Sequence, residues 1–215
     1  MAEQETNIGR VITSDACVAE GAAWLAASEP RFAEALAATG PLPLRLRPDG
    51  FGQLLQAIIS QQVSVASARA IWGKLEMAGM VTAPAILSVN EEDLRALGLS
   101  RQKAGYAHAL AGAGLDFDAL RGDPTAEVVR KLTAVKGIGI WTAEIYAMFS
   151  LGRADVFAPG DLALQEGARL LFDLPERPKD KALRQMAGAW SPWRSVAARI
   201  LWAYYHVEKQ REGTL

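Results

Sequence analysis

The pattern of hydrophobic and polar positions is helical over almost the whole chain. Apolar residues recur every three or four positions, and the alternation typical of strands is scarce. We therefore predict an all-α protein, with helices at 15–27, 30–39, 51–62, 64–78, 82–88, 91–97, 101–114, 124–134, 139–150, 162–172, 179–189 and 192–208. The segment 41–50, PLPLRLRPDG, is predicted to be extended because its prolines forbid a regular helix.

Capping residues mark the expected starts of several helices. The predicted N-caps are Asn90, Ser100, Asp123 and Ser191. Asn90 is followed three residues later by Asp93, as in a capping box. Pro124 and Pro192 come directly after two of these caps, where proline suits the first helical position.

Composition narrows the class of protein. Half of the 215 residues are hydrophobic, which fits a folded globular protein, and no apolar run approaches the roughly 20 residues of a membrane span. Cys17 is the only cysteine, and His108 and His206 are the only histidines, so neither a disulfide nor a cysteine- or histidine-rich metal site is expected. The polar N-terminus does not resemble a secretory signal. We therefore predict a cytoplasmic protein.

The net charge of −1 argues against a simple basic DNA-binding protein, whose affinity comes from many Lys and Arg side chains. It still allows an enzyme that grips one short stretch of nucleic acid. The candidate grip is the turn Lys136-Gly137-Ile138-Gly139 between two predicted helices. Free amide groups at the start of the second helix attract an anion, and Lys136 and Thr142 add a charge and a hydroxyl. The alternative is an ordinary helical hairpin whose glycines allow close packing.

Asp161 follows a Pro-Gly turn and precedes an apolar helix. One interpretation is an N-cap, for which Asp is well suited. The other is a catalytic carboxylate, since the positive end of a helix stabilises the anion. The two roles are compatible.

Four segments carry a resemblance to a known family. They are IISQQVSVASARAIWGKL (58–75), LTAVKGIGIWTAEIYAMF (132–149), DVFAPGD (155–161) and WSPWRSVAARILW (190–202). Together they resemble the 3-methyladenine DNA glycosylase II branch of the helix–hairpin–helix DNA glycosylase superfamily, over most of the chain from about 51 to 206. The segment WSPWRSVAARILW is far more specific for this family than a lone Gly-x-Gly turn.

The resemblance implies two helical lobes with a DNA cleft between them. Residues from about 51 to 120 would form one lobe. Residues from about 1 to 50 and from 121 to 215 would form the other, which would contain the hairpin at 124–150. The N-terminal sheet domain of the longest relative is not expected here.

The resemblance also assigns site residues. Asp161 takes the catalytic position, and Asp155, the competing candidate, takes a structural one. The base pocket maps onto Trp141, Trp202, Ile145 and Leu162; the last two replace tyrosines, which leaves the range of bases open. Trp202 is equally well explained as a core residue, and Trp190 and Trp193 are better explained as core residues, since large aromatic side chains dominate protein cores.

The DNA contacts implied by the resemblance lie at two places. They are Gln61, Gln62, Ser64, Lys136, Gly137, Ile138, Gly139 and Thr142. Gln62 takes the position of the wedge that fills the gap left by a flipped base. SQQVS is otherwise a polar junction between helices. The family also implies a sodium or potassium ion on the carbonyls of Thr133, Val135 and Ile138, with no other cofactor required.

The implied activity is hydrolysis of the N-glycosidic bond of alkylated purines in double-stranded DNA, chiefly 3-methyladenine and also 7-methylguanine, by a monomer. Relatives that also cut the backbone carry a Lys where this chain has Trp141, so release of the base alone is predicted. Their four-cysteine iron–sulfur loop is missing too. The alternatives are a non-catalytic DNA-binding protein that keeps the hairpin, and a helical interaction protein that does not bind nucleic acid.

Overall fold

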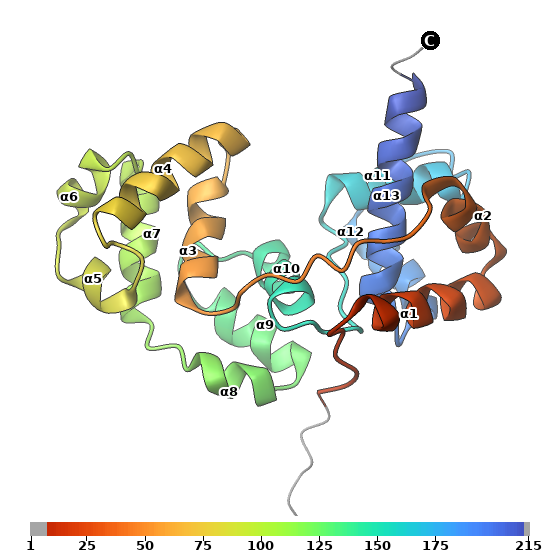
Figure 1. Cartoon of the computed structure of the whole chain (residues 1–215), viewed down its shortest axis with the longest axis horizontal. Helices are drawn as coiled ribbons and strands as arrows, with labels where there is room; N and C mark the ends of the chain where they lie inside the picture. The colour runs from red at the N-terminus through yellow and green to blue at the C-terminus, as the bar shows by residue number, and fades with distance from the viewer. Residues whose placement is uncertain (1–7, 213–215) are drawn as a thin grey trace, which may run out of the picture. The chain divides into compact units, whose positions relative to one another are not determined.

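The computed structural model describes residues 8–212, and the side chains of residues 8–210. As predicted, the fold is all-α: the described residues form helices and a single isolated β-bridge between Val11 and Arg153. The helices are α1 (Asp15–Ser28), α2 (Pro30–Thr39), α3 (Phe51–Ser60), α4 (Val65–Met77), α5 (Ala83–Leu87), α6 (Glu91–Ala96), α7 (Arg101–Gly112), α8 (Phe117–Gly122), α9 (Thr125–Thr133), α10 (Ile140–Phe149), α11 (Leu162–Leu171), α12 (Asp180–Met186), the 3₁₀ helix η1 (Ala187–Trp190) and α13 (Arg194–Glu212) (Figure 1). No described helix has the length and apolar character to span a membrane.

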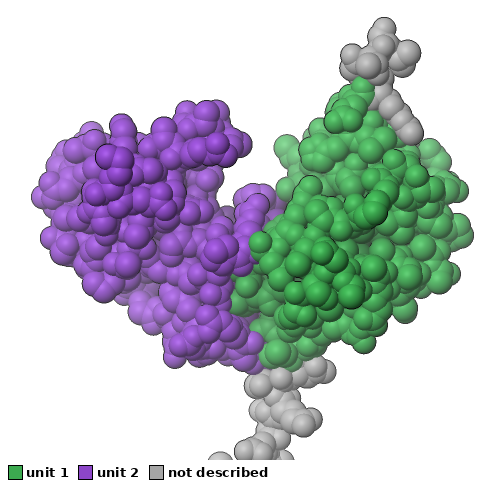
Figure 2. All heavy atoms as spheres, viewed as in Figure 1, with its two compact units in different colours: residues 1–46, 147–215 green, residues 47–146 purple. Residues whose placement is uncertain are grey.

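The chain divides into two compact units (Figure 2). The hairpin unit comprises residues 47–146, and the terminal unit comprises residues 1–46 and 147–215. This boundary differs from the expected one, because residues 121–146 belong with 51–120 rather than with the chain ends. The Gln61 side chain donates to the Gly137 carbonyl at 3.0 Å and so joins residues 121–146 to the segment after α3. Two further contacts bring residues 47–50 into the same unit. Arg121 pairs with Asp49, and the Tyr146 hydroxyl accepts a 2.8 Å hydrogen bond from the Gly50 amide.

The hairpin unit is built around α7, against which α3, α5 and α6 pack. Each of these helices buries a narrow apolar face and leaves its polar side chains outside, as a short surface helix must. Helix α3 contributes Leu54, Leu55, Ile58 and Ile59, all of which are fully buried. Hydrophobic burial of this kind, at roughly 25 cal/mol per Å² of apolar surface, is the main force that holds such small helices together.

The terminal unit is built around α13, which packs against α1, α2 and α11. Its aromatic centre is Trp190, whose ring stacks on Phe172 and meets Phe32 and Phe157 edge-on. The segment before α1 is joined to the segment after α10: the Ile12 amide donates to the Gly152 carbonyl at 2.7 Å. Gly152 has φ +66°, and a Cβ there would lie 2.6 Å from the Ile12 carbonyl oxygen, so only glycine fits.

The capping predictions succeed in part. Asn90 and Asp93 form the predicted capping box, and Ser100 caps α7 through the Lys103 amide. The extended segment at 41–50 is confirmed as non-helical.

Asp123 and Ser191 were wrong as N-caps. Asp123 accepts a 2.7 Å hydrogen bond from the Lys131 ammonium, and the carbonyl of Pro124 begins α9 instead. The Ser191 hydroxyl donates to Asp155, and α13 starts only at Arg194, after the cis Ser191–Pro192 bond. In both places another side chain holds the one that would otherwise cap the helix: Lys131 of α9 for Asp123, and the distant Asp155 for Ser191.

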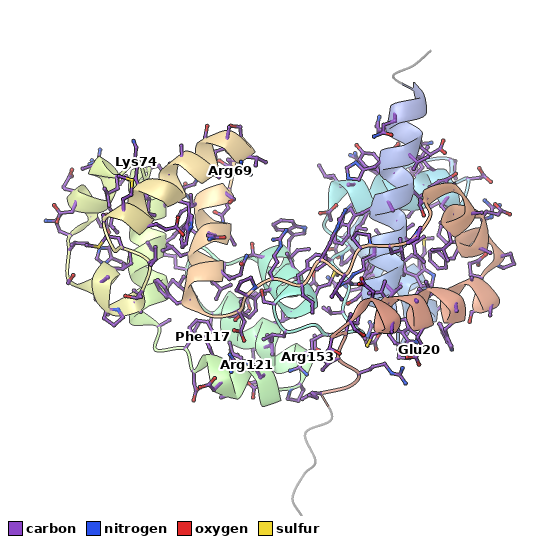
Figure 3. All side chains as sticks on the ribbon, viewed as in Figure 1. Glu20, Arg69, Lys74, Phe117, Arg121 and Arg153 are labelled. Atoms are coloured by element: carbon purple, nitrogen blue, oxygen red, sulfur yellow. The ribbon has the colours of Figure 1, made fainter. Side chains whose placement is uncertain are left out.

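Helix α8 was not predicted. Its six residues are too few to show a period, and it follows α7 closely. Asp116 caps it by accepting from the Ala119 amide at 2.9 Å, and Leu120 is buried. Phe117 and Arg121 lie at its start and near its end (Figure 3). The Asp116 N-cap is the signal in the sequence that could have revealed it.

Candidate functional site

The segment 155–161 begins at a carboxylate that is fully engaged in an ion pair. Asp155 accepts two hydrogen bonds from the Arg194 guanidinium, at 2.6 and 2.9 Å, and one from the Ser191 hydroxyl at 2.8 Å. Burial raises the pKa of the Asp155 carboxyl, but these hydrogen bonds outweigh burial, so its pKa lies below the usual value. A bidentate pair of this kind fixes geometry and leaves the carboxylate poorly suited to chemistry. Asp155 is therefore a structural residue of this segment, as the resemblance implied.

The rest of the segment is held through its backbone. The buried Ser195 hydroxyl contacts the carbonyls of Arg153 and Val156, and the buried Gln165 amide donates to the Pro159 carbonyl at 2.8 Å. The Asp161 amide donates to the Ala158 carbonyl. Buried polar groups are stable only when hydrogen-bonded. Each of these bonds therefore fixes the backbone that carries Asp161.

Asp161 caps α11, as one interpretation of the sequence predicted. Its Oδ1 accepts from the amides of Ala163 at 2.9 Å and Leu164 at 3.1 Å. The same oxygen accepts a 3.1 Å hydrogen bond from the indole Nε1 of Trp202. Three donors converge on one oxygen at the start of α11 and fix the plane of the carboxylate. The side chain is half-buried, so it is both held and accessible.

The tryptophans of the last motif divide between two roles. Trp190 and Trp193 are buried in the core, where Gly21 of α1 packs against the ring of Trp193. Trp202 is also buried, at 8% exposure, but it reaches Asp161 and lies 5.7 Å from the ring of Phe149. Leu162, next to Asp161, is 62% exposed, which leaves an apolar surface beside the carboxylate.

The Gly-x-Gly turn is exposed at its two ends, while Ile138 at its centre is buried and Tyr106 packs against Gly137. Gly137 has φ +98°, and a Cβ there would lie 2.4 Å from Cγ of Tyr106, so the turn requires glycine for both conformation and space. Lys136 and Gly139 are exposed, and α10 begins directly after Gly139. The turn therefore presents a helix start to solvent, which is the arrangement that binds anions. Thr142 is buried, so its hydroxyl is less accessible than the sequence suggested.

The polar junction after α3 is attached to this turn. The Gln61 amide donates to the Gly137 carbonyl at 3.0 Å, so Gln61 supports the turn. Ser64 caps α4 by accepting from the Ser67 amide. Gln62, the predicted wedge, is exposed and has φ +56°. Strained backbone of this kind costs about 1–3 kcal/mol and is concentrated at functional sites.

Trp141 and Ile145 of α10 belong to the hairpin unit. Trp141 is 45% exposed, and Ile145 is half-buried. The remaining turn residue, Ile138, is buried and its amide donates to the Val135 carbonyl. The cation on the carbonyls of Thr133, Val135 and Ile138 stays a prediction. Among residues 8–210, no group of three or more His, Cys, Asp or Glu side chains is placed to hold a metal.

Sequence reasoning missed the residues that support the site. Ser195, Gln165 and Arg194 hold the segment that leads to Asp161, and Tyr106 lies under the Gly-x-Gly turn. Arg194 and Ser195 stand within the matching motif WSPWRSVAARILW, which was the available signal for them. Nothing in the local pattern marks Gln165 or Tyr106: Gln165 bonds to a backbone carbonyl, that of Pro159, and Tyr106 packs against Gly137, which is distant in sequence.

Comparison with known proteins supports the resemblance. A crystal structure of a DNA-3-methyladenine glycosidase from Bacillus halodurans superposes with a TM-score of 0.80 and 34% identity, over 94% of this chain and 95% of that one. The Schizosaccharomyces pombe 3-methyladenine DNA glycosylase Mag1, solved in complex with abasic DNA, superposes with a TM-score of 0.72 and 27% identity, over 85% of this chain and 95% of that one. The alkylbase DNA glycosidase-like protein mag2 of the same yeast is 26% identical over 190 residues, covering 83% of this chain and 89% of the relative.

The family match covers the hairpin and the Asp161 segment together. Residues 55–192, more than half of the chain, match the family described as HhH-GPD superfamily base excision DNA repair protein. The described residues are mostly helical, and their fold superposes on those two solved structures. The chain belongs to the HhH-GPD superfamily of base excision DNA repair proteins.

Proposed function

We propose that this protein is a base-excision DNA glycosylase that hydrolyses the N-glycosidic bond of alkylated purines and leaves an abasic site. The observation that carries the proposal is the setting of Asp161. Its carboxylate is held by two amides of α11 and by Trp202, in a chain that belongs to a base excision repair family. The solved and curated relatives named above include 3-methyladenine DNA glycosylases.

Asp161 acts on the sugar of the target nucleotide. Cleavage of the bond between C1′ and the base nitrogen passes through a sugar with oxocarbenium character, as in glycoside hydrolysis. A fixed anion stabilises that cation and orients or deprotonates the attacking water. An alkylated purine that already carries positive charge leaves without a general acid. One carboxylate is therefore sufficient for this class of base.

The exposed turn at Lys136–Gly139 holds a DNA phosphate, and Gln62 fills the gap left by the flipped base. The surface beside the carboxylate is apolar at Leu162, and Ile145 is the other aliphatic residue at a predicted pocket position. Because both lack an aromatic ring, fewer rings remain to attract a cationic purine, and Trp141 supplies the exposed one. We assign 3-methyladenine as the main substrate and 7-methylguanine as the second, acted on by a monomer.

We further propose that the enzyme lacks lyase activity. A glycosylase that cuts the backbone uses a Lys amine to form a Schiff base with the sugar, and Trp141 stands at that position. Treatment with borohydride in the presence of damaged DNA should therefore trap no protein–DNA adduct. Lys136 is the nearest amine in sequence, and a trapped adduct that disappears in Lys136→Ala would refute this proposal.

The test of the function is release of bases from DNA treated with a methylating agent. Wild-type protein should release 3-methyladenine and, more slowly, 7-methylguanine, and should leave abasic sites in equal number. Asp161→Asn, purified in the same way, controls for contaminating glycosylases. Wild-type protein that binds DNA but releases no base would contradict the proposal and favour a non-catalytic DNA-binding protein.

A further inference from the structure

Arg199 is a buried cation in the terminal unit. Its side chain is 1% exposed, and its guanidinium donates to the carbonyl of Leu44 at 3.0 and 3.3 Å and to that of Ser195 at 2.9 Å. Within the part of the chain that the structure describes, no carboxylate pairs with it. Burial and the nearby Arg45 lower the pKa of Arg199 to about 10. Burying a charge costs free energy unless nearby groups compensate for it, so contacts of Arg199 beyond these hydrogen bonds should help to stabilise its charge.

The ring of Phe149, the last residue of α10, supplies one such contact. Cζ of Arg199 lies 4.9 Å from the centroid of this ring, within the range of a cation–π interaction. The same ring lies 5.7 Å from that of Trp202, tilted by 30°. Arg199 and Trp202 are three residues apart on α13, so they share one face of that helix, and Phe149 contacts both.

Trp202 connects these contacts, from Arg199 to Phe149 and from Phe149 to Trp202, with the carboxylate of Asp161. Its indole Nε1 donates to Asp161 Oδ1 at 3.1 Å. The direction of an indole N–H is set by the plane of its ring, and a hydrogen bond weakens steeply as the donor turns away from the acceptor. A shift of Phe149 would free the ring of Trp202 to tilt, and the carboxylate would lose one of the donors that fix it.

We propose that Arg199 is a positioning residue: it holds Phe149 against Trp202, so that the Trp202 indole N–H stays directed at Asp161. The proposal rests on the proposed function of Asp161 and extends it to a residue that does not contact DNA. The competing role is purely structural, in which Arg199 only fastens Leu44 to α13. The two roles differ in what happens at Trp202.

The first experiment observes the indole N–H of Trp202 in the free protein by ¹H–¹⁵N NMR, assigned by its loss in Trp202→Phe. Arg199→Leu and Phe149→Leu should each shift this resonance, and Arg199→Lys should shift it less because the positive charge remains. Arg169→Leu, which removes a partly exposed Arg paired with Glu166 on α11, is the matched control. A folded Arg199→Leu or Phe149→Leu protein with an unmoved resonance would overturn the proposal.

The second experiment measures single-turnover base release together with affinity for abasic DNA. Arg199→Leu should slow release by roughly 10- to 100-fold, as small misplacements of catalytic groups do, with little change in affinity. In the Trp202→Phe background the same substitution should have almost no further effect, since the series is already broken. Independent, multiplicative effects would contradict the proposal.

If Arg199→Leu does not fold, Phe149→Leu tests the same set of contacts, because Phe149 lies between Arg199 and Trp202. The NMR measurement needs no activity. A wild-type protein that releases no base would therefore refute the proposed function while leaving the link from Arg199 to Trp202 open to direct observation.

Discussion

The Gly-x-Gly turn and the segment 155–161 present their chemistry in opposite ways. The turn offers backbone amides at an exposed helix start, and its end residues, Lys136 and Gly139, are exposed. The segment offers one side chain, Asp161, and fixes it through Arg194, Ser195, Gln165 and Trp202. A backbone grip needs only the right local conformation. A catalytic carboxylate needs partners from elsewhere in the chain, so substitutions in the two regions should fail in different ways.

The largest effect on activity is expected from substitution of the Asp161 carboxylate. Asp161→Asn should slow single-turnover base release by about 1,000-fold, because a neutral amide stabilises neither the sugar cation nor the attacking water. Its carbonyl oxygen can still accept from Ala163 and Leu164, so the cap and the melting temperature should be nearly unchanged. Asp155→Asn is the matched control and should retain far more activity. Equal losses in both variants would remove the distinction between the two carboxylates.

The second effect is on stability and tests the structural role of Asp155. Asp155→Asn should lower the free energy of unfolding by about 2 kcal/mol at pH 7, because it breaks a partly buried bidentate pair with Arg194. Urea titrations measure this free energy, and Asp173→Asn, at an exposed ion pair with Arg31, should change it by less than about 1 kcal/mol.

The difference in unfolding free energy between wild type and Asp155→Asn should change with pH in one direction only. The folded pKa of Asp155 lies below its unfolded value, so the ionised pair stabilises the protein fully above the unfolded pKa, near 3.8. That stabilisation is lost as the pH falls through the lower, folded pKa. The gap between wild type and Asp155→Asn should therefore be constant from neutral pH down to about 5 and should shrink in stronger acid. A gap that widens on acidification would contradict the assignment.

Substitutions in the Gly-x-Gly turn should lower stability by straining its backbone. Gly137→Ala should destabilise the hairpin unit by about 2 kcal/mol or more, because φ +98° is strained for Ala and its Cβ would overlap Tyr106. Gly139→Ala is the control: its Cβ meets nothing within 4 Å, and its unfolding should differ little from that of wild type. Thermal unfolding followed by circular dichroism separates the two. A Gly137→Ala protein as stable as Gly139→Ala would show that the turn can adjust.

The smallest effect concerns the exposed charge at the turn. Lys136→Ala should weaken binding of abasic DNA by a few-fold and reduce the slope of log affinity against log salt by about one, as expected for one lost phosphate contact. Fluorescence anisotropy at several salt concentrations measures both quantities. Lys181→Ala, at an exposed lysine of α12, should leave the slope unchanged. The same change in both variants would mean that Lys136 acts only through overall charge.

The sequence by itself determined most of the helices, though not α8, together with the Asn90 and Ser100 caps, the Gly-x-Gly turn and the candidate role of Asp161. Periodicity, capping and glycine conformation are local properties. The resemblance gave Asp155 a structural position and Trp202 a pocket position, but their hydrogen-bond partners, 39 and 41 residues away, could not be predicted from the sequence. Ser191 was misjudged as a cap for the same reason, because its partner is Asp155, whereas Asp123 was misjudged because an ion pair with the nearby Lys131 engages it. Tertiary structure alone decided that Arg194 and Ser191 saturate Asp155 while Asp161 stays half-buried at the start of α11, because hydrogen-bond partners are chosen in space and not along the chain.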